Sequence, residues 1–352
     1  MPHRVPVAIL AATGSVGQRF VQLLDNHPWF EVTALTGSER AIGQEYSQAC
    51  HWILPEPMPA WARTMQILPT DPGLLSTPLV LSALPADIAL EVEPRLAQAG
   101  MVVCSNASAY RRAPDVPILL PEVNPDHAGL IADQRQQRGW SGAIVTNPNC
   151  TSTGLTVALK ALQDGFGLRK VFVVSLQAVS GAGYPGVASL DILDNVIPYI
   201  NGEEEKVEWE TRKMLGVLDG GGISQANFVV SAHTNRVAVS DGHIVCLSVE
   251  LGQKATLEEA AQCLREYSAP EPSCDLPSAP HPVIALRTEP DRPQPRLDRM
   301  TGKGMTTIVG RLRPDPIFDF KMVVLSHNTV RGAAGGSIYN AELLYKRGYI
   351  TV

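Results

Sequence analysis

VPVAILAATGSVGQRFVQLL, residues 5–24, joins an apolar run of β character to a glycine-containing turn and a segment of helical character. In such a strand–turn–helix unit, small turn residues let the backbone approach a pyrophosphate at the helix N-terminus. The first glycine expected in this turn is replaced by Ala11, and a tight turn without a ligand is the alternative interpretation. We predict dinucleotide-binding residues at Thr13, Gly14, Ser15 and Val16.

The runs that follow alternate between strand and helix character. Strands are predicted at residues 31–35, 79–84 and 101–104, with a helix over 87–99. Alternation of buried strands and helices is typical of a parallel, doubly wound sheet. The first half of the chain therefore indicates a Rossmann-like dinucleotide-binding domain of the α/β class.

A different pattern begins at Cys150. A helix is predicted at 153–162, and the strand-like runs 170–178, 228–239 and 243–251 follow with few helices between them. This pattern predicts an α+β catalytic and dimerisation domain with a large mixed sheet.

These patterns suggest domain boundaries. We expect a first domain at 1–149, completed by a C-terminal helix within 329–352, and a second domain at 150–328. The proline-rich stretch 270–295 is expected to be an irregular excursion, and the sequence assigns it no function.

Composition excludes several classes of function. The 352 residues carry a net charge of −6 and no long basic run, so nucleic acid is not an expected partner. No uncharged run approaches the roughly 18 residues needed to cross a membrane. Six cysteines without a C-x-x-C pair predict neither a zinc site nor a disulfide framework. We expect a cytoplasmic protein without a bound metal.

The segment NPNCTS, residues 147–152, places Cys150 after an apolar strand and before a predicted helix. A helix N-terminus lowers the pKa of a thiol and offers N–H groups to an oxyanion. Cys150 is therefore the predicted nucleophile, whereas Cys104, Cys246 and Cys263 are interpreted as inert buried side chains.

A thiolate needs a base, and NRVAVSDGH, residues 235–243, ends on His243 after a turn formed by Asp241 and Gly242. Arg236 in the same segment suits bidentate capture of a carboxylate. A surface ion pair and a structural histidine are the ordinary alternatives for these two residues.

Cofactor selectivity is expected to depend on the end of the second predicted strand, where residues 36–40 are TGSER. An NAD site usually has an acidic residue here for the ribose hydroxyl, whereas Ser38 and Arg40 suit a 2′-phosphate. Glu39 leaves NAD open as the alternative. We therefore favour NADP as the cofactor.

Five segments occur in the order found in aspartate-semialdehyde dehydrogenases, which this chain resembles over nearly its whole length. They are the glycine turn, NPNC at 147–150, QAVSGAG at 177–183, residues 236–243, and NTVRGAAG at 328–335. The archaeal and fungal branch of that family is the most similar, because SNASAYR at 105–111 is followed by PDVP at 114–117.

The resemblance implies a role for each residue of the predicted site. Cys150 is implied to be the nucleophile, His243 the acid/base and Gln177 a residue that orients the substrate. Arg236 is implied to clamp the substrate carboxylate, and Glu203 to bind its amine. The residues implied to hold phosphate are Lys206, Arg111 and Asn149. For Glu203, the start of a solvated acidic helix is the commoner meaning.

The same resemblance implies an NADP-dependent enzyme that acts on a small molecule and inorganic phosphate, as a homodimer or homotetramer. The cofactor contacts expected beyond the glycine turn are Ser38, Arg40, Ser82, Ala83, Leu84, Ser180, Gly181, Asn328 and Gly332. Arg112 stands where the branch commonly has methionine, and it is expected to add positive charge near the phosphate.

The implied reaction is the reductive dephosphorylation of L-aspartyl 4-phosphate to aspartate 4-semialdehyde through a cysteine thioester. This step belongs to the biosynthesis of lysine, threonine, methionine and isoleucine. Malonyl-CoA reductase, an enzyme of the same build, is the nearest alternative and needs no amine site. N-acetylglutamyl-phosphate reductase is less favoured, because residues 203–206 and 328–335 follow the semialdehyde pattern. A non-catalytic dinucleotide-binding sensor is the alternative of another class.

Overall fold

The first half of the chain folds around a six-stranded parallel sheet. The computed structural model describes residues 4–351. The strand order is β3-β2-β1-β4-β5-β6. Side chains of β1 alternate between two apolar clusters, one on each face, so the sheet is doubly wound as predicted. The strands are β1 (Val5–Leu10), β2 (Phe30–Thr36), β3 (Ile67–Leu68), β4 (Leu79–Ser82), β5 (Val102–Ser105) and β6 (Ala143–Thr146).

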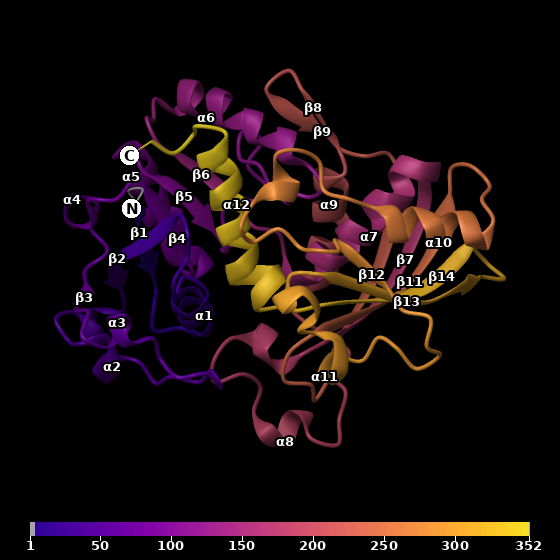
Figure 1. Cartoon of the computed structure of the whole chain (residues 1–352), viewed down its shortest axis with the longest axis horizontal. Helices are drawn as coiled ribbons and strands as arrows, with labels where there is room; N and C mark the ends of the chain where they lie inside the picture. The colour runs from indigo at the N-terminus through magenta and orange to yellow at the C-terminus, as the bar shows by residue number, and fades with distance from the viewer. Residues whose placement is uncertain (1–3, 352) are drawn as a thin grey trace.

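Helices from both ends of the chain surround this sheet (Figure 1). The C-terminal helix α12 (Gly335–Lys346) contacts β4, β5 and α1, and it runs beside the sheet as the yellow helix of Figure 1. The other helices here are α1 (Ser15–Leu23), α2 (Tyr46–Ala49), α3 (Ala60–Arg63), α4 (Pro72–Leu75), α5 (Ala86–Gln98) and α6 (Leu130–Arg138).

The second sheet is mixed and has the order β10-β7-β11-β14-β13-β12. Its inner face packs on α7 (Cys150–Phe166), α9 (Glu203–Met214) and α10 (Leu257–Glu266) around one apolar core. The predicted α+β domain with a large mixed sheet is therefore confirmed. Its strands are β7 (Leu168–Gln177), β10 (Val229–Arg236), β11 (His243–Leu251), β12 (Ile284–Leu286), β13 (Thr307–Pro314) and β14 (Phe320–Ser326).

Smaller elements lie outside the two sheets. The remaining helices are α8 (Ser189–Ile192) and α11 (Pro295–Asp298), and β8 (Val217–Asp219) pairs with β9 (Gly222–Ser224) as a separate hairpin. Among residues 4–351, no helix is both long enough and apolar enough to cross a lipid bilayer.

The proline-rich stretch 270–295 is more ordered than predicted. It contains β12, which pairs in parallel with β13 at the edge of the sheet. It is also fastened to α12, because the Tyr339 hydroxyl donates to the Ser273 carbonyl at 2.9 Å and the Ser278 hydroxyl donates to buried Glu342 at 2.6 Å. Hydrogen bonds between residues so far apart in the sequence produce no periodic pattern, so the order of this stretch could not be predicted.

We propose to divide the chain after Asn149 and after Asn328. The first boundary falls directly before α7, and the second falls between β14 and α12. The outermost residues of the proposed first domain, 1–3 and 352, lie outside the described part of the chain.

Candidate active site

Three predicted site residues meet at one edge of the second sheet. Gln177 ends β7 and pairs with Arg236, which ends the parallel strand β10. His243 begins β11, which runs antiparallel to β7, so that Ile244 faces Leu176. Strand direction therefore brings together side chains that are up to 66 positions apart in the sequence.

Cys150 is brought to this edge by the start of α7. Asn149 is the N-cap residue, and its Oδ1 accepts from the N–H groups of Thr151 at 2.9 Å and Ser152 at 3.2 Å. This cap explains why the helix begins at Cys150, before the predicted start at 153. The Cys150 sulfur lies 3.3 Å from His243 Nε2. The predicted nucleophile and its predicted acid/base are thus in contact.

Burial favours a neutral thiol at Cys150 and a neutral imidazole at His243. Burial, with a smaller contribution from nearby Glu203, raises the pKa of Cys150 to about 12, although Arg111 and Arg236 act in the opposite direction. Burial lowers the pKa of His243 to about 3, and Arg236 contributes in the same direction. The prediction that the helix N-terminus gives this thiol a low pKa is wrong, because loss of solvation outweighs the effect of the helix.

The His243 ring has a defined tautomer in this geometry. The Ala178 N–H donates to Nδ1 at 3.1 Å. A nitrogen that accepts cannot carry the proton, so the neutral ring holds its proton on Nε2 and presents it to the Cys150 sulfur. Protonating Nδ1 would break the bond from Ala178, which also disfavours the imidazolium form.

Two glycines allow the close packing around these residues. A Cβ on Gly332, in the π turn Val330–Ala334, would lie 2.9 Å from the Cys150 Cβ. A Cβ on Gly181 would lie 3.1 Å from His243 Nε2 and 2.8 Å from Arg236 Nη1. A larger side chain at either glycine would therefore collide with the reacting groups.

A cavity of about 760 Å³ joins the first domain to this edge of the second sheet. Most of the predicted site residues line it: Thr13, Gly14, Ser15, Val16, Ala83, Leu84, Arg111, Asn149, Cys150, Gln177, Ser180, Gly181, Glu203, Lys206, Arg236, Asn328 and Gly332. His243 lies beneath the wall, buried and in contact with Cys150.

Besides His243, four residues with predicted roles at the cavity are not part of its lining. Ser38 and Arg40 are exposed just beyond the end of β2. Ser82 is buried, and its carbonyl accepts from the Asn106 backbone and side-chain amides. Arg112 pairs with Glu205 on the surface and lies over the Trp209 ring. The expectation that Arg112 adds charge near the phosphate is therefore wrong.

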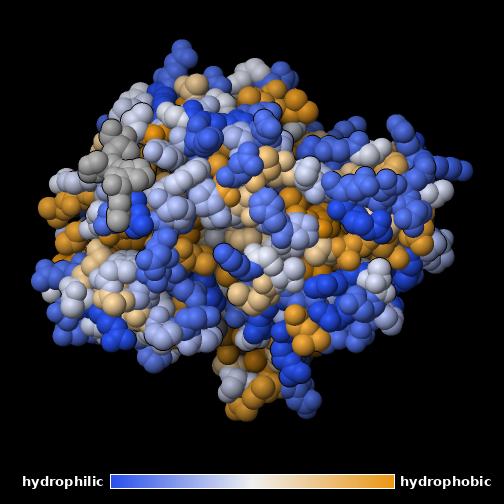
Figure 2. All heavy atoms as spheres, in the orientation of Figure 1, coloured by the Kyte–Doolittle hydropathy of each residue, from blue (hydrophilic) through white to orange (hydrophobic). Residues whose placement is uncertain are grey.

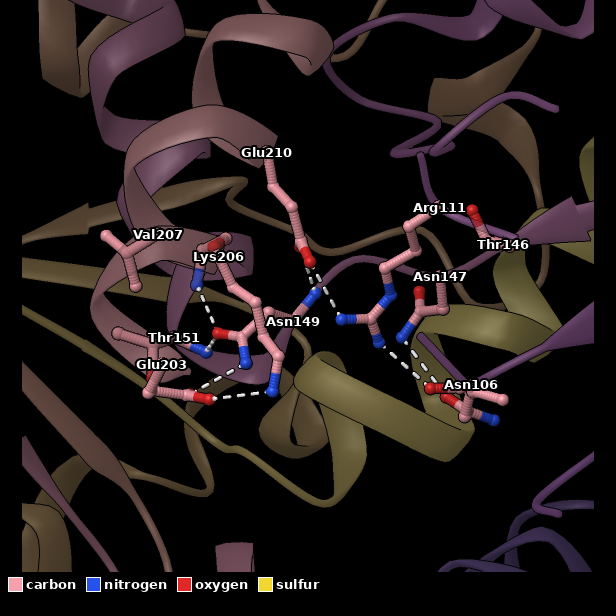
Figure 3. Close-up of polar contacts among 12 residues, drawn as sticks. Asn106, Arg111, Thr146, Asn147, Asn149, Thr151, Glu203, Lys206, Val207 and Glu210 are labelled. Atoms are coloured by element: carbon pink, nitrogen blue, oxygen red, sulfur yellow. Dashed lines mark hydrogen bonds and ion pairs between the residues drawn. The ribbon is translucent and has the colours of Figure 1, made fainter. Parts of the chain in front are cut away.

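Glu203 is not a solvated helix residue, because it is only 6% exposed and faces the cavity. Its Oε1 accepts from Asn149 Nδ2 at 2.7 Å and from Gln177 Nε2 at 3.2 Å. Lys206 Nζ lies 3.6 Å from its Oε2 (Figure 3). One carboxylate thus links three of the predicted site residues.

The glycine turn fits an anionic ligand. Ala11 has a left-handed φ of 52°, which explains why glycine is usual at this position. A Cβ on Gly17 would lie 2.3 Å from the Ala11 carbonyl oxygen. The N-terminus of α1 has no side-chain cap, and Ser15 and Val16 in its first turn line the cavity. Its free N–H groups can therefore donate to a phosphate.

Comparison with known proteins decides the family. The family model "Semialdehyde dehydrogenase, NAD binding domain" matches residues 6–131, and "Semialdehyde dehydrogenase, dimerisation domain" matches residues 159–331. The aspartate-semialdehyde dehydrogenase of Archaeoglobus fulgidus is 53% identical over 347 residues, which cover 99% of this chain and all of that protein. The chain belongs to the aspartate-semialdehyde dehydrogenase family.

Solved structures of this family have the same fold. The aspartate-semialdehyde dehydrogenase of Candida albicans with NADP has a TM-score of 0.91 and 41% identity, covering 99% of this chain and 100% of the other. Aspartate-semialdehyde dehydrogenase II of Vibrio cholerae, complexed with ASA, has a TM-score of 0.79 and 25% identity, covering 98% and 99%. The similarity therefore includes both domains.

Sequence reasoning missed several residues of this semialdehyde dehydrogenase site. His51 of the first domain and Tyr184 of the second both line the cavity, and their ring centres are 5.6 Å apart. Asn106 also lines it and accepts from Arg111 through its carbonyl. Asn106 lies in the quoted SNASAYR segment, which was a usable signal. Buried Glu210, which contacts Arg111, stood in a charged run with no such signal.

Proposed function

We propose that this protein is an NADPH-dependent aspartate-semialdehyde dehydrogenase, which converts L-aspartyl 4-phosphate to aspartate 4-semialdehyde and phosphate in amino-acid biosynthesis. The observation that carries the proposal is the contact between Cys150 and His243 in a cavity that a carboxylate, Glu203, and a guanidinium, Arg236, also line. A nucleophile, a proton carrier and groups for both ends of an amino acid are thereby placed together.

Cys150 is proposed to form the covalent intermediate. Its sulfur attacks the acyl carbon, the bond from that carbon to the phosphate oxygen breaks, and a thioester remains. NADPH, when bound in the cavity, would supply the hydride that reduces this thioester, and the Cys150 sulfur then leaves as the thiohemiacetal collapses to the aldehyde. The N–H groups of Thr151 and Ser152 are used by the cap, so the Cys150 N–H is the helix donor that remains for the oxyanion.

His243 is proposed to carry the protons between sulfur and substrate. At rest its Nε2–H points at the sulfur, because Nδ1 accepts from Ala178. Uptake of the thiol proton at Nε2 requires the other tautomer, in which Nδ1 is protonated and the bond from Ala178 is lost. We propose that His243 changes tautomer when the substrate binds.

Substrate recognition is proposed to follow charge. Glu203 is a buried carboxylate at the cavity wall and suits the substrate ammonium group. Arg236 uses Nη1 to donate to the Ala178 carbonyl at 2.8 Å, which leaves other N–H groups for the substrate carboxylate. Gln177, bonded to Glu203, is proposed to orient the reacting end.

Phosphate is proposed to bind Arg111 and Lys206. Two nitrogens of Arg111 are engaged, by Glu210 and by the Asn106 carbonyl, whereas buried Nε has no partner among residues 4–351. An unpartnered N–H of a cation at a cavity wall supports an anion site. The Asn149 amide is engaged by its own helix and by Glu203, so we give it a supporting part.

The glycine turn, and Gly332 beside Cys150, are the residues proposed to hold NADP, which would supply the hydride. The uncapped N-terminus of α1 suits the pyrophosphate, and Ala83, Leu84, Ser180, Gly181 and Asn328 line the same cavity. Ser38 and Arg40, exposed beyond β2, remain the proposed contacts of the 2′-phosphate. The solved Candida albicans relative contains NADP, which supports this cofactor.

The alternatives are less favoured. A malonyl thioester has no amine, so it would not use the buried carboxylate of Glu203 that lines the cavity. A non-catalytic sensor would not need the contact between Cys150 and His243. The sequence relatives named above are aspartate-semialdehyde dehydrogenases, not enzymes of either kind.

A homodimer or homotetramer is proposed. The outer face of the second sheet is apolar yet partly exposed, with Val174, Cys246 and Val323 side by side on neighbouring strands. Exposed apolar residues also gather around α8, at the lower tip of the molecule, where Leu190 is 90% exposed (Figure 2). Apolar surfaces of this kind mark protein interfaces. We also propose a cytoplasmic location, which the unpaired cysteines support.

A component-omission assay tests the function. With aspartate semialdehyde, NADP and phosphate, the enzyme should form NADPH, and leaving out any one of the three should stop formation. Activity with malonyl-CoA and none with the semialdehyde would assign the enzyme to the malonyl-CoA reaction. Light scattering of the eluting protein measures the oligomeric state in the same preparation.

A further inference from the structure

Glu210 of α9 is a fully buried carboxylate that contacts two parts of the active site at once. Its Oε1 accepts from Arg111 Nη1 at 2.9 Å, and its Oε2 accepts from the backbone N–H of Asn149 at 2.6 Å (Figure 3). We propose that Glu210 is a positioning residue that fixes the phosphate-binding guanidinium relative to the helix start carrying Cys150. This inference rests on the proposed function.

The first contact sets the orientation of Arg111. Glu210 holds Nη1, and the Asn106 carbonyl holds Nη2 at 2.9 Å. Two anchored nitrogens fix a planar guanidinium, so that the unpartnered Nε–H has one direction. Without Glu210, the guanidinium loses its buried counter-ion and is free to rotate away from the anion.

The second contact sets the position of the nucleophile. The N–H of an N-cap residue has no partner within its own helix, and Glu210 supplies one for Asn149. Cys150 is the next residue. The same carboxylate therefore sets the distance between the Cys150 sulfur and the guanidinium proposed to bind the leaving phosphate. Acyl transfer requires the attacking and leaving groups to be held in a fixed relative geometry.

A lysine on the next turn of α9 fixes the segment that carries Arg111. Lys213 is 6% exposed, and its ammonium donates to the carbonyls of Arg111, Ala113 and Val116 at 2.7, 2.9 and 2.9 Å. Glu210 and Lys213 are three residues apart and share one face of the helix. Lys213 thus already holds the backbone of the Arg111 segment. The contact from Glu210 is therefore interpreted as orienting the Arg111 side chain and not as holding the segment in place.

Glu210→Gln tests the proposal in the complete enzyme. The amide keeps the size of the carboxylate but removes its charge, and its NH2 must face one of two donors. We expect phosphate KM to rise at least about 10-fold and kcat to fall, with NADP KM changed less than about twofold. Glu205→Gln on the exposed side of α9 is the matched control and should match the parent enzyme.

Glu210→Asp separates positioning from stability. It restores the charge at a shorter reach, so phosphate KM should lie between those of the parent and Glu210→Gln. If Glu210→Gln fails to fold, the phosphate KM of Glu210→Asp decides alone: a rise supports the proposal. An unchanged phosphate KM in a folded variant, whatever its melting temperature, overturns it. A parent enzyme with no phosphate-dependent activity would instead refute the proposed function.

Discussion

Replacing Gly181 by alanine should slow the reaction by a calculable amount. The new Cβ would lie 3.1 Å from both Cε1 and Nε2 of His243 and 2.8 Å from Arg236 Nη1, whereas ordinary contact begins at 3.4 Å. His243 must then withdraw by about 0.3 Å and Arg236 by about 0.6 Å, the differences between 3.4 Å and these distances. Both side chains are buried and bonded to Ala178, so neither withdraws without losing a hydrogen bond.

A misplacement of about 1 Å costs roughly 100-fold in rate, so these shifts predict a fall in kcat of roughly 4- to 20-fold. The assay is NADPH formation with all three substrates saturating. Gly222→Ala is the control, because its Cβ would meet only the Asp219 carbonyl oxygen at an ordinary 3.8 Å. A Gly181→Ala enzyme with the parent kcat would refute the reasoning that places these two side chains at the reacting centre.

Three further predictions concern stability, pH and substrate binding. Arg331→Met should lower the free energy of unfolding by about 3–5 kcal/mol in a urea titration, because Glu122, 1% exposed, loses its cation; a change below about 1 kcal/mol would contradict this. The rate of alkylation of Cys150, measured without substrate or cofactor, should still increase from about pH 9 to 11, because burial raises the pKa of the thiol to about 12 from the ordinary 9.0. A rate that reaches its plateau near neutral pH would contradict this, because it would show that the thiolate is already formed there. Glu203→Gln should raise the KM for aspartate semialdehyde about 10-fold or more with little change for NADP, because the buried charge for the amine is lost; an unchanged KM would remove Glu203 from the substrate site.

Local signals in the sequence predicted the elements that carry the chemistry. The glycine turn, NPNC and the segment ending at His243 each combine a strand end with a turn or helix start, and strand direction brings such ends together. Sequence spacing alone did not reveal solvation. Burial raises the pKa of Cys150, although a helix N-terminus acts in the opposite direction, and the extent of burial depends on the whole fold.

Residues whose meaning depends on distant partners were not predictable. Glu210 and Lys213 lie in a strongly charged helix that resembles a solvated one, and their partners are about 100 positions away. Arg112, which stands where the family branch commonly has methionine, was expected to add positive charge near the phosphate. Successive side chains diverge around the chain, so it lies instead on the surface against Trp209.

Mass spectrometry of the intact enzyme tests the covalent step most directly. Incubation with aspartate semialdehyde and NADP, without phosphate, should leave one aspartyl group on Cys150, and added phosphate should remove it while aspartyl phosphate appears. Cys150→Ala should gain no adduct and form no NADPH. NADPH formation by Cys150→Ala, or an adduct on another residue that phosphate discharges, would contradict the thioester mechanism.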